Sequence, residues 1–405
     1  MSDMKSQPRH AALPVTGMPF VLILSALMAF TSLSTDIYLP ALPAMQKDLQ
    51  GNTELTITGF LLGFCIAQLV WGPVSDHLGR RKPLIIGMVL FIVGSIGCSL
   101  SHNITQIVFW RVFQALGACT GPMLARAMIR DLFTRTRAAQ MLSVLMMIMS
   151  VAPIAGPLMG GQIIRFASWQ AIFWLLAVLG TLMLISLYWL PETLPPEKRV
   201  KSSPVRAVTN YYSLLRNTVF MRFTLCLAFY YLGVYAFVAG SPFVYISYFG
   251  VDPQYFGWLF AVNIVGVVIM SQANRHLVRH YPLEKLLKVA AVVAAIAATL
   301  LALVSAGHPA GMVLIVITVL FFFSMNGIIA AGSTAAALDN AGEITGSASA
   351  LIGSLQYGSG IFASLLLAMF NDGTPWTMAW IIWVFSLASA IMALTTRVQP
   401  QRDED

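Results

Sequence analysis

Two ionisable side chains interrupt long apolar segments of this sequence, an acid at Asp36 and a base at Arg111. Asp36 follows Ser25 and Ser32 at intervals of seven and four residues, so the three share one face of a helix. A carboxylate in hydrocarbon is costly and is commonly functional. Burial and a nearby guanidinium shift the proton affinity of such a carboxylate in opposite directions. The two residues therefore predict a proton-coupling site with Asp36 as the proton carrier.

Both charges also permit a structural interpretation. Asp36 could lie at the membrane interface, and Arg111 could extend along its aliphatic stem to reach that interface. Gln114 lies one helical turn from Arg111 on the same face, which favours a polar pocket instead. The side chains that we predict to bind substrate are Ser32, Tyr38, Gln114, Tyr235, Asn263, Asn326, Gln356 and Tyr357.

The chain that must position these residues is strongly apolar. It has 405 residues, of which 58% are hydrophobic and 10% are charged. A soluble protein carries more charge on its surface. Apolar runs of about 20 residues recur along the whole length, which predicts about twelve membrane-spanning helices. We therefore expect an all-α membrane protein.

The formal net charge of +8 follows the predicted topology. Lys and Arg are concentrated in loops that alternate to one side, and the opposite loops carry little beyond Lys47 and Arg165. This asymmetry is typical of cytoplasmic loops in membrane proteins and not of a nucleic-acid-binding surface. It predicts that both termini lie in the cytoplasm.

One polar and basic segment divides the chain. We predict an N-terminal six-helix half over residues 1–194, a cytoplasmic linker over 195–217 and a C-terminal six-helix half over 218–405. A short repeat supports duplication, because His77-Leu78, Arg80 and Pro83-Leu84 recur at the same internal spacing as His276-Leu277, Arg279 and Pro282-Leu283.

A conspicuous motif separates the second and third apolar segments: Gly72-Pro73-Val74-Ser75-Asp76-His77-Leu78-Gly79-Arg80-Arg81-Lys82. The three successive cations indicate a cytoplasmic loop. Topology alone does not require the glycines, the proline or the acid. The pattern resembles the loop between helices 2 and 3 of the major facilitator superfamily. The resemblance implies a conformational gate formed by Gly72, Asp76, Gly79, Arg80 and Arg81, in which Asp76 contacts the start of helix 11 and an Arg of the loop.

Three further motifs resemble this superfamily. Asp36-Ile37-Tyr38-Leu39-Pro40 resembles the helix 1 motif of its drug exporters. The segment 111–117 resembles its helix 4 motif, with Ala115 where a glycine is usual. The segment 153–161 resembles a helix 5 motif of its antiporters, with Pro153, Gly156, Pro157, Gly160 and Gly161 at the motif positions.

Taken along nearly the whole chain, the sequence resembles bacterial multidrug exporters of the bicyclomycin/chloramphenicol resistance type. Ser241-Pro242-Phe243-Val244-Tyr245-Ile246 and Phe256-Gly257-Trp258 contribute to this likeness. It implies the major facilitator fold, with 12 transmembrane helices in two six-helix halves, in the inner membrane. It also implies drug:proton antiport by alternating access in a monomer that needs lipid, protons and a small-molecule substrate, but no other cofactor, metal or nucleic acid.

Because Asp36 is the single carboxylate that we place within the membrane, we expect about one proton per substrate and a preference for neutral or zwitterionic drugs. Export of a metabolite such as an amino acid or nucleoside, or proton-driven import on the same fold, remains an alternative.

Two other classes of protein fit the residues less well. The six histidines lie in predicted loops or interfaces, which argues against a membrane-embedded enzyme. A channel would usually show rings of charge or a repeated filter. Metal binding is not expected either, because no C-x-x-C pair occurs among Cys65, Cys98, Cys119 and Cys226.

Overall fold

The computed structural model describes residues 18–133, 137–138, 140–142, 145, 149–199, 204–306 and 311–396. Every regular element in these ranges is helical. Eleven of the described helical segments are long and apolar enough to cross a membrane. The remaining expected span, helix 5, is represented by α8, whose described part has 15 residues. The predicted all-α membrane fold is confirmed.

The helices before the linker are α1 (Met18–Asp36), α2 (Leu42–Leu49), α3 (Glu54–Leu78), α4 (Arg81–Ser99), α5 (Ile104–Ala118), α6 (Thr120–Leu132), α8 (Ala152–Phe166) and α9 (Gln170–Ser186), with η1 (Leu39–Ala41) and η2 (Leu187–Trp189). The linker contains η3 (Pro196–Lys198) and α10 (Pro204–Arg216). The helices after it are α11 (Thr218–Pro242), η4 (Phe243–Tyr248), α12 (Pro253–Leu277), α13 (Leu283–Ala306), α14 (Met312–Ser324), α15 (Asn326–Asp339), η5 (Gly342–Ile344), α16 (Thr345–Phe370) and α17 (Pro375–Thr395).

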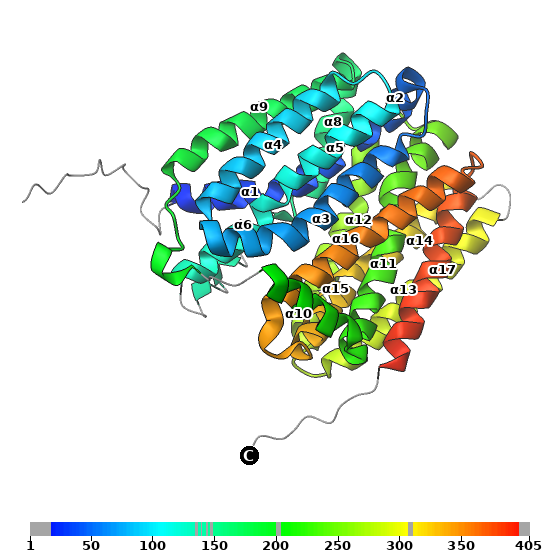
Figure 1. Ribbon diagram of the computed structural model, residues 1–405. Helices are drawn as coiled ribbons and strands as arrows, with labels where there is room; N and C mark the ends of the chain where they lie inside the picture. The colour runs from blue at the N-terminus through cyan, green and yellow to red at the C-terminus, as the bar shows by residue number, and fades with distance from the viewer. Residues whose placement is uncertain are drawn as a thin grey trace, which may run out of the picture.

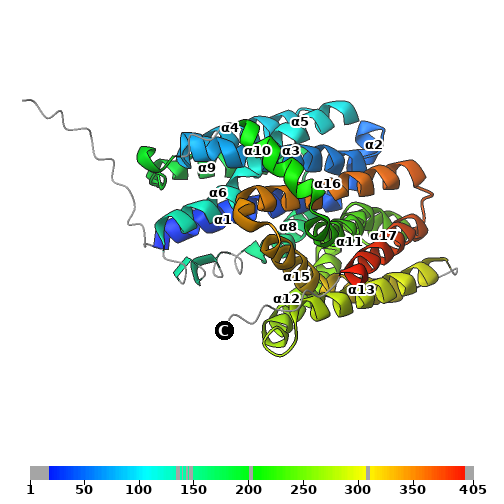
Figure 2. The same cartoon turned by 60° about the horizontal axis from the view of Figure 1, so that its bottom comes forward.

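The two groups of helices lie beside each other, as Figure 1 shows. The blue-to-green helices up to α9 gather on one side, and α11 to α17 gather on the other. Figure 2 shows α10 lying across α3 and α16. Helices α3 and α16 pack along most of their length, with Thr58 Oγ1 donating to Ser364 Oγ at 2.7 Å and Cys65 Sγ 2.9 Å from Ser354 Oγ. We name the two ends of the bundle after the ends of α3, the Glu54 end and the Asp76 end.

The first membrane segment is a broken helix. Helix α1 ends at Asp36, and the chain continues through η1 into α2. Pro40 explains the break, because a proline has no N–H for the carbonyl four residues earlier and its ring crowds that carbonyl. The carbonyl four residues before Pro40 belongs to Asp36. The predicted acid therefore stands at a helix end inside the first span.

The gate motif is more helical than we expected. Helix α3 continues through Pro73 to Leu78, and α4 begins at Arg81, so the prediction that residues 72–82 form a loop is wrong. Gly79 ends α3 with a φ of 90°, a left-handed conformation that favours glycine. Two residues therefore suffice to connect α3 with α4.

Pro73 also links the linker helix to α3. Its missing N–H leaves the carbonyl of Leu69 without its helical donor. The hydroxyl of Tyr211 on α10 donates to Leu69 O at 3.3 Å. Burial raises the pKa of this half-buried phenol, which keeps the hydroxyl protonated as a donor. The linker is therefore anchored to the helix that carries the gate motif.

Replacing Tyr211 by Phe should loosen this anchor. The substitution removes one hydrogen bond, which contributes about 1 kcal/mol, and keeps the ring. We expect a lower melting temperature of the purified protein in detergent. Tyr212→Phe is the matched control, because Tyr212 is 55% exposed and its ring contacts Arg216. Equal melting temperatures for both variants would show that the Tyr211 hydroxyl does not hold α10 in place.

Candidate functional site

Arg111 is enclosed in a cage of aromatic rings and backbone carbonyls. Its side chain is fully buried, and its guanidinium carbon lies 4.3 Å from the ring centroid of Tyr38 and 4.4 Å from that of Phe60. Nη1 donates to the carbonyl of Ser34 at 3.1 Å. A cation held over aromatic faces is stabilised by the ring quadrupoles, more so when water is excluded. This burial is incompatible with a side chain that extends to the membrane interface.

The cage continues from Arg111 into α4. Arg111 Nη1 also donates to Gln114 Oε1, as their spacing on one helix face indicates. Gln114 Nε2 donates in turn to Ser95 Oγ at 2.8 Å. A Cβ at Gly94 would lie 2.5 Å from the backbone nitrogen of Gln114, so α4 and α5 approach closely here. The guanidinium is thus oriented through an amide that is itself held by a hydroxyl.

We expected the Arg111 guanidinium to lie beside the Asp36 carboxylate, but the two side chains do not form an ion pair. Asp36 is 8% exposed, and no hydrogen bond or ion pair to its carboxylate is formed by the described residues. Arg111 contacts the same helix two residues earlier, at the Ser34 carbonyl. The last four carbonyls of a helix lack helical donors and carry the negative end of its dipole. Arg111 therefore caps the end of α1 and leaves the carboxylate free.

The predicted helix 5 motif packs against the break in α1. A Cβ at Gly160 would collide with the carbonyl oxygen of Ile37, and a Cβ at Gly156 would lie 3.3 Å from the Cβ of Asp36. On its other side, a Cβ at Gly161 would lie 2.5 Å from the carbonyl oxygen of Pro253, at the start of α12. Pro153 opens α8, and Pro157 is buried within it. The glycines thus bring α8 against both α1 and α12.

Aromatic side chains connect the Arg111 cage to the second group of helices. Phe60 and Phe64 on α3 have ring centroids 6.1 Å apart, and Phe64 lies 4.1 Å from Tyr357 on α16. Tyr357 is 6.2 Å from Tyr235 on α11. Both tyrosines were predicted from the sequence, but the two phenylalanines were not. The spacing of four residues between the phenylalanines on α3 was the available signal.

Of the other predicted pocket residues, Asn326 reaches this cluster through a hydrogen bond with Tyr231, whose ring centroid lies 6.1 Å from that of Tyr235. Asn263 is fully buried on α12, and its Nδ2 donates to Leu259 O at 3.3 Å. The Oδ1 atoms of Asn263 and Asn326 are buried without a partner among the described residues. Ser32 and Gln356 are half-buried. None of these four side chains forms a hydrogen bond with Asp36 or Arg111 in the described ranges.

The gate motif is organised around Arg80 at the Asp76 end. Arg80 is 8% exposed, and its Nη1 donates to Asp76 Oδ1 at 2.7 Å. Its Nε donates to Asp131 Oδ2 on α6 at 2.9 Å. Burial alone would lower the pKa of Arg80, but the hydrogen bonds and charges of Asp131 and Asp76 outweigh it and raise the pKa. The guanidinium therefore stays charged and binds α3 to α6.

Glu192 fixes the short connection between α3 and α4. Its carboxylate accepts the backbone N–H of Arg80 at 2.8 Å and of Arg81 at 3.2 Å. A Cβ at Gly79 would lie 2.5 Å from Glu192 Oε2. The roles of Asp131 and Glu192 were not predicted from the sequence, although Glu192 stands in the conspicuous Pro191-Glu192-Thr193-Leu194 segment at a helix end.

Two details of the implied gate differ in the structure. The pairing of Asp76 with an Arg of the motif is present, but in the described residues its carboxylate forms no hydrogen bond or ion pair with the start of α16. A Cβ at Gly72 would meet nothing within 4 Å, so Gly72 does not bring α3 close to a neighbour here. The carboxylate of Asp76 instead pairs with Arg80, one turn further along the chain.

The spanning helices define a multi-pass membrane protein whose bundle encloses a buried acid and a caged cation. The chain belongs to the Major Facilitator Superfamily, whose family model matches residues 24–365. This membership identifies it as a transporter of small molecules and confirms the family predicted from its motifs.

Curated relatives cover most of the chain. It is 36% identical to "Uncharacterized MFS-type transporter YdgK" of Bacillus subtilis, over 91% of this chain and 93% of the relative. It is 28% identical to "Bicyclomycin resistance protein homolog" of Haemophilus influenzae, over 87% and 90%, respectively. It is 30% identical to "Multidrug resistance protein D" of Escherichia coli, over 85% and 87%. A solved D-xylose-proton symporter shares the fold, with a TM-score of 0.69 at 16% identity over 94% of this chain and 98% of that chain.

Gly160 in the site and Gly72 in the gate motif offer a matched pair of substitutions. Gly160→Ala should destabilise the protein severely and abolish transport, because its Cβ would overlap the carbonyl of Ile37. Gly72→Ala should be tolerated and should gain about 0.5–1 kcal/mol from helix propensity. Expression, monodispersity and melting temperature of both variants measure the difference. A Gly160→Ala protein with the wild-type melting temperature would contradict the close packing of α8 on α1.

Proposed function

We propose that the protein is a drug:proton antiporter that exports small neutral or zwitterionic drugs, such as bicyclomycin- or chloramphenicol-like compounds. The observation that carries the proposal is the Asp36 carboxylate, which is buried at the break of α1 without a hydrogen-bond partner among the described residues. An ionised carboxylate in that position is expensive unless it takes a proton or meets a ligand. Relatives named "Bicyclomycin resistance protein homolog" and "Multidrug resistance protein D" support the choice of substrate.

In this mechanism a proton and a drug use the site in turn. Binding of a proton neutralises Asp36, and release of that proton restores a charge that the bilayer disfavours. Arg111 holds the Ser34 carbonyl at the end of α1, so a movement of α5 is transmitted to the helix that carries Asp36. The seam between α8 and α12 is where the N-terminal half, 1–194, would move against the C-terminal half, 218–405.

The basic motif supports one orientation of the chain in the membrane. The Asp76 end, which carries this motif, faces the cytoplasm together with both termini and the linker. The Glu54 end faces the outside. The transporter works as a monomer in the inner membrane, with protons as the coupling ion and no other cofactor.

Asp36→Asn should abolish proton-driven export and leave insertion intact, because the amide cannot carry a proton between the two sides. The measurement is chloramphenicol uptake into inverted vesicles under an imposed pH gradient, which also reports the direction of transport. Asp252→Asn is the control, since this exposed residue caps α12 through Gln254 N and asparagine caps equally well. Full-rate export by Asp36→Asn would exclude Asp36 as the coupling site, and substrate movement in the opposite direction would indicate an importer.

Arg111→Lys should lower the transport rate at least about tenfold. An ammonium cannot reproduce the planar fork that reaches Ser34 O and Gln114 Oε1 while lying over aromatic rings. Arg165→Lys provides the control, because that residue is exposed and its ring contact is with Phe166 on the same helix. Initial rates in vesicles measure both variants. A wild-type rate for Arg111→Lys would show that any cation is sufficient in the cage.

A further inference from the structure

Glu54 is a second buried carboxylate. It begins α3 and is 2% exposed. Oε1 accepts from Asn371 Nδ2 at a long 3.4 Å, and Oε2 is buried without a partner among the described residues. No salt bridge to Glu54 occurs in the described part of the chain. A buried carboxylate normally has a cation or several donors, so this group is incompletely satisfied.

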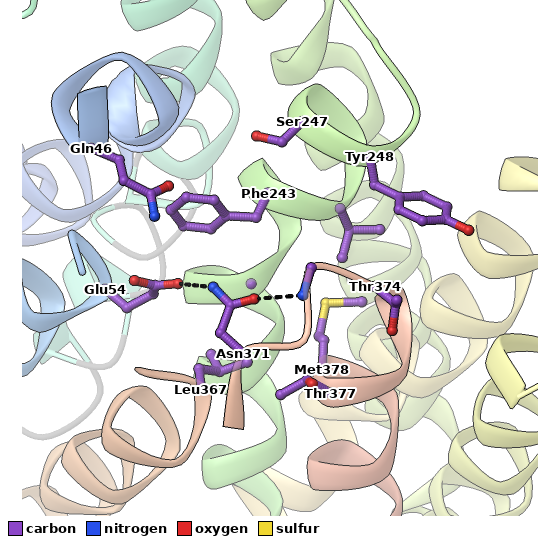
Figure 3. A pocket seen from close by; sticks show the side chains of 13 residues that line it. Gln46, Glu54, Phe243, Ser247, Tyr248, Leu367, Asn371, Thr374, Thr377 and Met378 are labelled. Atoms are coloured by element: carbon purple, nitrogen blue, oxygen red, sulfur yellow. Dashed lines mark hydrogen bonds between the residues drawn. The ribbon is translucent and has the colours of Figure 1, made fainter. Parts of the chain in front are cut away.

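A cavity of about 350 Å³ adjoins this carboxylate at the Glu54 end. Figure 3 shows Glu54, Phe243 and Gln46 on one side of the cavity and Tyr248 on the other. Ser247, Thr377 and Met378 also line it. A ligand pocket typically encloses about 300 Å³ or more. A bound proton alone would need no such space, so the cavity favours a molecule.

The charges around the cavity select for a cation. Glu54 is the one charged side chain among the residues that line it, and Asp372 stands between the lining residues Asn371 and Gly373. Lys47 and Asp48 are exposed at the same end of the bundle but do not line the cavity, and Asp48 instead accepts a hydrogen bond from Trp169 Nε1. Burial would raise the pKa of Asp372, but hydrogen bonds from Thr374 and Thr377 outweigh it and lower the pKa. Asp372 is therefore ionised at neutral pH. The cavity rim is accordingly negative.

The lining also suits an ammonium group with an apolar body. Phe243 presents a ring to a cation paired with Glu54, an arrangement that stabilises quaternary ammonium groups. Met378 adapts to apolar shapes, and Ser247 and Thr377 provide hydroxyls. Tyr248 is 45% exposed, so the cavity can be reached from this end of the bundle. We infer that the Glu54 cavity binds an organic ammonium, either a monocation or the ammonium end of a zwitterion.

This inference deepens the proposed function, and it rests on that function in taking the ligand to be a transported compound. The site would serve as an outer subsite that receives substrate after Asp36. It also removes the reason for excluding cationic substrates, because Asp36 is no longer the single buried carboxylate of the chain.

The test is binding of radiolabelled phenyltrimethylammonium to the full-length protein in nanodiscs. Glu54→Gln keeps the shape and the contact with Asn371 but removes the charge, so we expect the Kd to rise at least about tenfold. Phe243→Leu should raise the Kd about two- to fivefold through loss of the ring. Asp48→Asn, an exposed acid at the same end, should bind within about twofold of wild type. The uncharged isostere tert-butylbenzene should not compete.

A wild-type Kd for Glu54→Gln, with melting temperature unchanged, would overturn the site. Equal competition by tert-butylbenzene would overturn it too, because the cavity would then be an apolar pocket. If Glu54→Gln keeps probe binding and instead alters the pH dependence of chloramphenicol export, Glu54 is a proton carrier and the ammonium site is excluded. Failure of proton-driven export in the wild type would remove the proposed function, whereas a Glu54-dependent Kd would still support the site.

Discussion

The end of α1 inside the bundle is the feature on which the rest of the site depends. Pro40 removes the donor for the carbonyl of Asp36, so the helix stops in the first membrane span. Arg111 donates to the Ser34 carbonyl and lies over aromatic rings, which stabilise the fully buried cation, while its Nη2 has no hydrogen-bond partner among the described residues. The glycines of α8 then close on the break beside Asp36. Pro40, Arg111 and the glycines of α8 therefore all contribute to the structure at this helix end.

A proline also leaves a backbone carbonyl without its helical donor near the Asp76 end of α3. Pro73 leaves the Leu69 carbonyl free, and the linker helix supplies a hydroxyl from Tyr211. The gate motif nearby is held by Arg80 between Asp76 and Asp131. Tyr211 of the linker therefore binds α3 through a hydrogen bond, and Arg80 binds the end of α3 to α6 through ion pairs. A movement of α3 affects both sets of contacts together.

Two carboxylates, those of Asp36 and Glu54, are buried in different surroundings. Asp36 lies at a helix end within the bundle, and Glu54 lies beside a cavity at one end of it. Neither pairs with a cation in the described residues. Because unpaired buried charge is costly, each position favours a proton or a positively charged ligand. The aromatic rings from Phe60 to Tyr235 connect the Arg111 cage with the second group of helices.

Hydropathy, loop charge and motif spacing were sufficient to predict an all-helical membrane transporter, its family, and the grouping of Arg111 with Gln114. These properties depend on local sequence, since spans of about 20 apolar residues and a helical period are readable without partners. Tertiary structure alone decided that Asp36 and Arg111 stay apart, that residues 72–78 extend α3, and that Glu54 is buried. Arg111 is held by the Ser34 carbonyl, and Glu54 accepts from the Asn371 amide. The extended end of α3 receives the Tyr211 hydroxyl, and the turn after it donates to Glu192. These partners come from segments distant in sequence, which hydropathy and spacing do not record.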